Sequence, residues 1–72
     1  DFSKLQPELF LEALRSLVPA QRLVFNLVLV DGYSLAEAAE LLDCSPEAAK
    51  FNLEKARLNF NKRILQLSPA SH

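Results

Sequence analysis

Apolar residues recur at intervals of three and four along most of the chain, a spacing that predicts helices. This pattern is divided by prolines at positions 7, 19, 46 and 69. Because proline suits the first turn of a helix and breaks its interior, we expect one helix from near Pro7 to about Leu17. A second should run from near Pro19 to Val30 or Asp31. Its segment LVFNLVLV also holds strand-forming residues, but the chain contains no second strand signal to pair with it.

Two signals mark the end of the second helix and the start of a third. Gly32 provides a left-handed stop, since glycine adopts positive φ without steric cost. Ser34 and Glu37 have the spacing of a capping box, in which each side chain accepts a hydrogen bond from the backbone N–H of the other residue. We therefore predict a short third helix at about residues 34–42.

The fourth helix is the longest that the pattern predicts. Ser45 is expected as its N-cap and Pro46 as its first residue, and it should run to about residues 65–67. At about 100° per residue, its apolar side chains fall on two stripes. The core stripe contains Ala49, Leu53, Ala56, Phe60, Ile64 and Leu67. The other stripe, which we call the outer seam, lies almost opposite and contains Phe51, Leu58 and Leu65.

These elements predict an all-α fold, a four-helix bundle that contains a helix-turn-helix at about residues 34–65 and no wing. Residues 1–67 should form one domain and residues 68–72 a tail. The two helices of such a unit cross at a steep angle, which requires small residues at the crossing. Ala39 and Ala49 are expected there.

Charge is distributed unevenly over the 72 residues. The formal net charge is −1, so the overall positive charge typical of a DNA-binding domain is missing. Residues 1–49 hold eight acidic and three basic side chains, a net charge of −5, whereas residues 50–72 hold five basic and one acidic, a net charge of +4. Only the fourth helix could contact a polyanion. The alternative is that its lysines and arginines form an ordinary solvated surface.

Catalysis and metal binding find little support. The single histidine, His72, is the last residue, and the single cysteine, Cys44, has no histidine near it in sequence. Nucleophilic catalysis needs a nucleophile beside a base, and a structural zinc site needs four ligands. One glycine cannot make a glycine-rich phosphate loop. We therefore expect no enzyme, no cofactor and no metal.

The expected location is the cytoplasm, without membrane insertion. No apolar run reaches the roughly 18 residues of a transmembrane helix. The N-terminus DFSKLQPELF lacks the basic and apolar regions of a signal peptide. A single cysteine also fits a reducing compartment.

Residues 18–57, VPAQRLVFNLVLVDGYSLAEAAELLDCSPEAAKFNLEKAR, resemble region 4 of bacterial RNA polymerase sigma factors of the extracytoplasmic-function group. That family's pattern has a proline-started helix over QR.VF.L, a GYS turn, an EIAE.LG.S helix and a basic recognition helix that ends in L..AR. The matching positions here are Pro19, Gln21, Arg22, Val24, Phe25, Gly32, Tyr33, Ser34, Glu37, Ala39, Glu40, Leu42, Ser45, Lys50, Leu53, Ala56 and Arg57. The variant with Asn52 and NL.KAR is similar to sigma factors of the Bacteroidetes kind.

The resemblance implies sequence-specific DNA binding at the promoter −35 element, as part of a sigma factor that directs RNA polymerase in transcription initiation. It implies promoter DNA and the flap of the polymerase β subunit as partners, with an anti-sigma factor as a further candidate. The family's full-length protein has an upstream domain for the −10 element. Because this chain lacks that domain and starts at Asp1, we expect it to be an excerpt of a longer one.

The DNA-binding residues expected are Arg22, Ser45, Glu47, Lys50, Phe51, Asn52, Lys55 and Arg57. Lys50 and Asn52 are the main candidates for base edges, since lysine pairs with guanine acceptors and asparagine binds adenine with two hydrogen bonds. Lys55 and Arg57 would position phosphates, as would Lys62, Arg63 and, by resemblance, Arg22. Ser45 caps the helix whose first amides would face a phosphate.

The chain departs from the family pattern around the turn. Asp43 stands where the family usually has glycine, which tolerates left-handed geometry better. Glu47 and Ala48 stand where the family often has Gly-Thr. Ala48 cannot offer a hydroxyl to phosphate, and Glu47 would repel the DNA backbone unless it accepts from a cytosine amino group. Phe51 replaces a small polar residue and could touch thymine methyl groups or another protein.

The outer seam has two interpretations. Exposed apolar patches often mark interfaces, so Phe51, Leu58 and Leu65 could bind the polymerase flap, an anti-sigma factor or a second copy of the domain. The other interpretation is that the N-terminal segment, with Phe2 and Leu5, folds back over part of the seam. The alternative function is therefore a sigma-like protein-interaction module with weak or no DNA binding.

Overall fold

The computed structural model describes residues 6–67, which form helices and connecting turns without any strand. The helices are α1 (Pro7–Arg15), α2 (Pro19–Phe25), α3 (Leu35–Leu41) and α4 (Pro46–Leu67), and α2 continues into a π-helical segment, η2 (Asn26–Val30). The predicted all-α fold is confirmed. Phe2 and Leu5, which the sequence suggests might cover the outer seam, lie outside the described residues.

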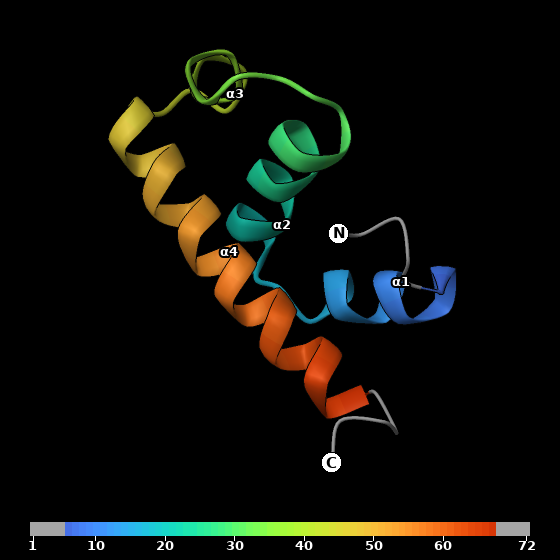
Figure 1. Ribbon diagram of the computed structural model, residues 1–72. Helices are drawn as coiled ribbons and strands as arrows, with labels where there is room; N and C mark the ends of the chain where they lie inside the picture. The colour runs from blue at the N-terminus through green and yellow to red at the C-terminus, as the bar shows by residue number, and fades with distance from the viewer. Residues whose placement is uncertain (1–5, 68–72) are drawn as a thin grey trace.

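Helix α4 is the central element, on which the other helices pack (Figure 1). Its 22 residues correspond to about 33 Å at 1.5 Å per residue, most of the 39 Å long axis of the molecule. Helices α1, α2 and α3 all pack against it. The α3 helix lies at the N-terminal end of α4 and α1 lies at the C-terminal half, with α2 between them (Figure 1). Within residues 6–67, the N-terminal half of α4 is held by α3, α2 and the η2 segment, whose side chains share one core cluster with it.

The core consists of two clusters along α4. One cluster joins α1, α2 and the C-terminal half of α4, and its buried members are Ala13, Leu17, Phe25, Ala56 and Phe60. The other joins α2, α3 and the N-terminal half of α4, and its buried members are Val24, Ala38, Ala39, Ala49 and Leu53. The predicted core stripe of α4 is thus confirmed, with Ile64 and Leu67 half-buried at its end.

Three phenylalanines form the centre of the first cluster. The rings of Phe25 and Phe60 are stacked with their centroids 4.8 Å apart. The Phe10 ring meets Phe60 edge-on, with centroids 5.3 Å apart. Both geometries are favourable arrangements of aromatic quadrupoles. These contacts join α1, α2 and the C-terminal half of α4 at one point.

The second helix is helical to Val30, as predicted, but its last turn is wider than expected. The N–H of Asp31 donates to the carbonyl of Asn26 over 2.8 Å, an i to i−5 bond in place of i to i−4. In this segment Leu29 packs against both core clusters. Gly32 follows at φ +87, the left-handed stop that the sequence indicates.

The first helix ends earlier than the predicted Leu17. The N–H groups of Ser16 and Leu17 donate to the carbonyls of Ala13 and Leu14 over 3.2 Å each, so the last turn is tightened into i to i−3 bonds. Proline at position 19 then holds Val18 in an extended conformation, with ψ 155. The Leu17 side chain is nevertheless buried in the first cluster.

Candidate nucleic-acid interface

The turn between α3 and α4 is closed by two backbone hydrogen bonds. The N–H of Cys44 donates to the carbonyl of Ala39 over 2.9 Å, and the N–H of Asp43 donates to the carbonyl of Glu40 over 3.2 Å. Together they form a Schellman motif, which satisfies the last carbonyls of a helix when the residue after the C-cap is left-handed. That residue is Asp43, at φ +56. The geometry explains why glycine suits this position.

The start of α4 is fixed by its own cap. The Ser45 hydroxyl accepts a hydrogen bond from the N–H of Ala48 over 3.1 Å, and Pro46 occupies the first helical position. Both features confirm the prediction. Only Cys44 separates the left-handed Asp43 from the cap residue Ser45. The direction of α4 relative to α3 is therefore set within the three residues 43–45.

Small residues allow α3 to cross α4 closely. Ala38, Ala39 and Ala49 are all buried, with no more than 2% of any of them exposed. They belong to one cluster with Val24 and Leu53, as predicted for Ala39 and Ala49. The contact leaves the opposite side of α4 free of the other helices.

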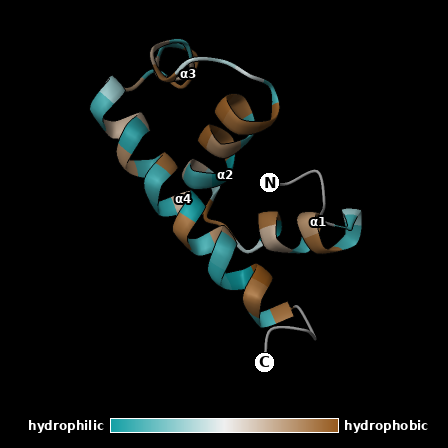
Figure 2. Ribbon diagram, in the orientation of Figure 1, coloured by the Kyte–Doolittle hydropathy of each residue, from teal (hydrophilic) through white to brown (hydrophobic). Residues whose placement is uncertain are grey.

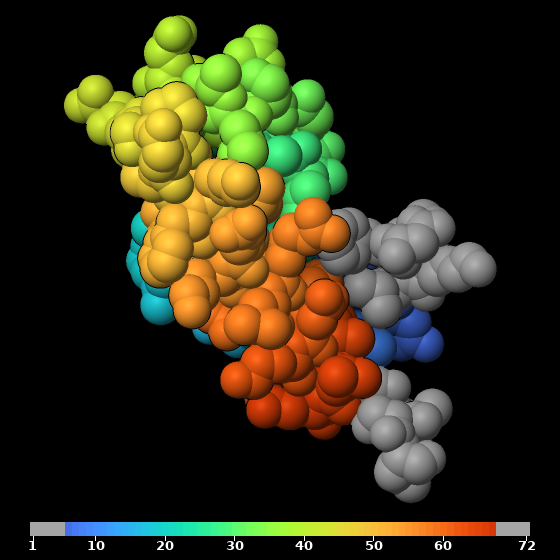
Figure 3. Space-filling view, turned by 60° about the vertical axis from the view of Figure 1, so that its left-hand side comes forward, coloured from blue at the N-terminus to red at the C-terminus, as the bar shows by residue number. Residues whose placement is uncertain are grey.

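That free side of α4 carries both charge and apolar surface. Phe51, Leu58 and Leu65 are 59%, 55% and 62% exposed, so the outer seam faces outward as predicted. The exposed charged residues of α4 are Glu47, Lys50, Glu54, Lys55, Arg57 and Lys62. Figure 3 shows α4, in yellow to red, along the length of this face, and in Figure 2 polar and apolar bands alternate along it. A long, exposed second helix after a tight turn is the geometry of helix-turn-helix proteins that bind the major groove.

Comparison with known protein families identifies this arrangement. The family described as Sigma-70, region 4 matches residues 8–60, which include all of α2, η2 and α3 and most of α4. The chain belongs to the sigma-70 region 4 family. Comparisons with curated proteins and with solved structures found no match.

Membership gives the region 4 domain a role in general terms. The family is a DNA-binding regulatory domain of sigma factors and not a known enzyme family. Membership in this family supports a role for the chain in binding the −35 promoter element during transcription initiation and in an interaction with RNA polymerase. The similarity to sigma factors of the Bacteroidetes kind stays a prediction. Within residues 6–67, no helix is long and apolar enough to cross a membrane.

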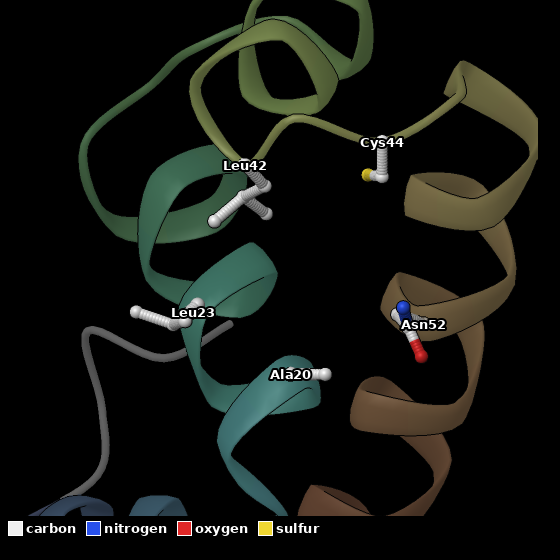
Figure 4. A pocket seen from close by; sticks show the side chains of 5 residues that line it. All are labelled: Ala20, Leu23, Leu42, Cys44 and Asn52. Carbon is white, nitrogen blue, oxygen red and sulfur yellow. The ribbon is translucent and has the colours of Figure 1, made fainter.

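The two residues expected at base edges do not share a face of the region 4 domain. Lys50 is exposed, whereas Asn52, about 200° away around α4, is half-buried. Asn52 lines a cavity of about 170 Å³ together with Ala20, Leu23, Leu42 and Cys44. Figure 4 shows its amide on the α4 side of this cavity, opposite α2. Lys50 and Asn52 therefore cannot both contact bases in one groove through the same face of α4.

The other expected DNA-binding residues lie in different surroundings. Arg22 is half-buried in α2, and Ser45 is exposed at its cap position. The Lys55 ammonium lies 5.7 Å from the centroid of the Phe51 ring, a cation–π distance. Arg57 is exposed and forms no ion pair within residues 6–67. Lys50, Phe51, Lys55 and Arg57 are therefore all exposed on α4, with Lys55 and Arg57 on opposite flanks of the helix, about 200° apart.

Arg63 is the one basic residue of α4 that is engaged elsewhere in the described part of the chain. Its Nη2 lies 3.9 Å from a carboxylate oxygen of Glu12 in α1, and its Nη1 donates to the Gln66 side chain over 3.1 Å. This position links α1 to α4 and removes Arg63 from the set of free cations. Of the expected phosphate contacts of α4, Lys55, Arg57 and Lys62 thus remain.

Sequence reasoning missed the cavity beside Asn52. Its lining comes from α2, from the turn after α3 and from α4, so no single stretch of sequence contains it. The angular separation of Lys50 and Asn52, by contrast, could have been derived from their spacing of two residues in a helix.

Proposed function

We propose that the N-terminal half of α4 enters the major groove of the promoter −35 element. The observation that carries this proposal is the outward side of residues 47–57, which α3 leaves uncovered in a helix-turn-helix of the sigma-70 region 4 family. Lys50 then faces base edges, and Lys55 and Arg57 contact phosphates on either side. Phe51, between them, touches thymine methyl groups.

Charge makes the affinity of the isolated domain modest. Its formal net charge is −1, and two acidic residues are exposed at the start of α4, Asp43 in the preceding turn and Glu47 in the first helical turn. Phosphate contacts supply most of the affinity of a DNA-binding domain, and here only a few cations provide them. In the full sigma factor, contact with the flap of the polymerase β subunit supplies the remaining affinity. Such a complex operates in the cytoplasm, where transcription takes place.

A matched pair of arginines tests this proposal. Arg57 in α4 and Arg15 in α1 are both exposed, so Arg57→Ala and Arg15→Ala remove the same charge from different faces. Fluorescence anisotropy with a labelled −35 duplex should show weaker binding for Arg57→Ala at every salt concentration. The slope of log affinity against log salt should also fall by about 0.9 for the lost phosphate contact. Equal effects of both variants would contradict the proposed orientation.

Base recognition needs a second variant. Lys50→Ala should lower the affinity for the −35 duplex by about 1–3 kcal/mol if the ammonium pairs with guanine acceptors. It should lower the affinity for an unrelated duplex of equal length much less. Equal loss on both duplexes would show that Lys50 contacts phosphate and not a base.

A second candidate function, that of a protein-interaction module, is favoured by one specific observation. The outer seam places three large apolar side chains, each more than half exposed, on one line of α4. Such contiguous apolar surface often marks an interface. The polymerase flap, an anti-sigma factor and a second copy of the domain are the partners considered for this surface.

A further inference from the structure

The outer seam repeats at intervals of seven residues. Phe51, Leu58 and Leu65 are spaced in this way, and all three are more than half exposed. Seven residues are close to two helical turns, so the three side chains follow one line along α4. The core of the domain packs on the other side through Ala49, Leu53, Ala56 and Phe60. A second helix could therefore lie along the seam without displacing α1, α2 or α3.

The seam has an acidic and a basic edge. Glu47 and Glu54 each come four residues before a seam residue, which places them about 40° to one side of it at 100° per residue. Lys55 and Lys62 each come four residues after a seam residue, about 40° to the other side. All four side chains are exposed. The order across this face is thus acidic, apolar, basic.

We propose that the occupant of the outer seam is a second copy of the same chain, with the two α4 helices parallel. A two-fold axis parallel to the helices places the acidic edge of each copy against the basic edge of the other. Glu54 of one copy then lies level with Lys55 of the other, and the pair occurs twice by symmetry. The apolar residues meet along the axis, Phe51 against Phe51 and Leu58 against Leu58.

The same charges make the antiparallel arrangement less favourable. With Leu58 of the two copies facing each other, the basic edges meet, and Lys55 of each copy lies beside Lys62 of the other. Like charges directly opposite repel and reduce association. The charges therefore favour the parallel pair over the antiparallel one. They also favour a second copy of the chain over an unrelated apolar helix, which would have no charges to pair with the two edges.

This pair makes the protein-interaction candidate specific, and it does not require that the domain binds DNA. If the domain both self-associates and binds DNA, the two complexes exclude each other, because the pair covers Phe51 and Lys55 on the outward side of α4. The interface is narrow, a single helix face on each side, so association should be weak and dependent on concentration.

Sedimentation equilibrium of the 72-residue chain without DNA tests the pair. The apparent mass should rise from 8.1 kDa towards twice that value between about 10 µM and about 1 mM, the range of a weak complex. Leu58→Asp should raise the dissociation constant at least about tenfold. Leu11→Asp is the control, because Leu11 is 50% exposed on α1, away from the seam. Helical circular dichroism of each variant shows that it is folded.

Charge reversal separates the parallel from the antiparallel arrangement. In the parallel pair, Lys55→Glu and Glu54→Lys each place like charges opposite each other and should weaken association several-fold. The double variant Glu54→Lys with Lys55→Glu exchanges the edges and should restore it. In the antiparallel pair, Lys55→Glu would instead face Lys62 and strengthen association.

Three results would overturn the proposal. They are a chain that stays monomeric up to about 1 mM, association that Leu58→Asp leaves unchanged, and association that Lys55→Glu strengthens. None of them concerns DNA, so each leaves the proposed −35 recognition standing. Conversely, loss of DNA binding by the domain would leave the predicted self-association testable as described.

Discussion

At the scale of single residues, the turn at Asp43 shows how local backbone geometry departs from residue preference. Asp43 adopts φ +56, a conformation that costs most L-residues about 1–2 kcal/mol and glycine nothing. The Schellman bonds of Asp43 and Cys44 require this conformation. The domain therefore retains some strain at the point where α3 turns into α4.

Asp43→Gly should stabilise the domain by about 0.5–1 kcal/mol, because relief of the left-handed strain exceeds the added entropy of the unfolded chain. The measurement is urea denaturation followed by circular dichroism. Asp31→Gly is the matched control, since Asp31 is also exposed but has φ −87, and it should give no stabilisation. An equal gain in both variants would show that removal of a negative charge, and not backbone strain, is responsible.

At the scale of helices, caps and prolines determine where most elements begin. Ser34 and Glu37 form a complete capping box, with bonds of 3.1 Å to the Ser34 hydroxyl and 2.9 Å to the Glu37 carboxylate. The Ser34 backbone N–H, and then its hydroxyl, hold the pKa of the Glu37 carboxyl below its usual value. These are local signals, which is why the starts of all the helices could be predicted from sequence.

Stability should depend on pH through this capping box. Because the pKa of Glu37 is lower in the folded than in the unfolded chain, its contribution is present above the unfolded pKa and is lost as pH falls through the folded pKa. The difference in melting temperature between the wild type and Glu37→Gln should therefore shrink between pH 6 and pH 3. Glu40→Gln, an exposed position on the same helix outside the box, is the control. A constant difference across this range for Glu37→Gln would contradict the assignment.

The features that sequence could not predict depend on how helices meet. The cavity beside Asn52 requires α2, α4 and the turn after α3 in their relative positions, and the wide turn at Asn26–Val30 accompanies the contact of Leu29 with both core clusters. Periodicity gives the faces of each helix but not the packing between them. The outer seam, by contrast, was predictable because it is a property of one helix alone.

At the scale of the whole molecule, stability depends on the aromatic contact between α1, α2 and α4. Phe60 is 1% exposed and stacks on Phe25. Burying an aromatic side chain contributes several kcal/mol to folding, a large share for a domain whose total is about 0.05–0.15 kcal/mol per residue. The attachment of α1 and α2 to the C-terminal half of α4 therefore depends on this one buried cluster.

Two phenylalanines of the same helix test this dependence. Phe60→Ala should cost about 3–5 kcal/mol and leave the chain largely unfolded. Phe51→Ala, at a position 59% exposed, should change stability by less than about 0.5 kcal/mol. Thermal denaturation of both variants gives the comparison. A large loss for Phe51→Ala would mean that the outer seam is covered in the folded chain.

DNA recognition by α4 is tested most directly by an NMR titration of the isotope-labelled domain. The titrant is a set of duplexes that contain candidate −35 sequences, at low and moderate salt. We predict chemical shift changes centred on residues 45–57 that weaken steeply with salt, as counterion release requires. Lys50 and Phe51 should move more than Asn52, which lines the cavity between α2 and α4. No shift even at low salt, or shifts confined to α1, would contradict DNA recognition by α4.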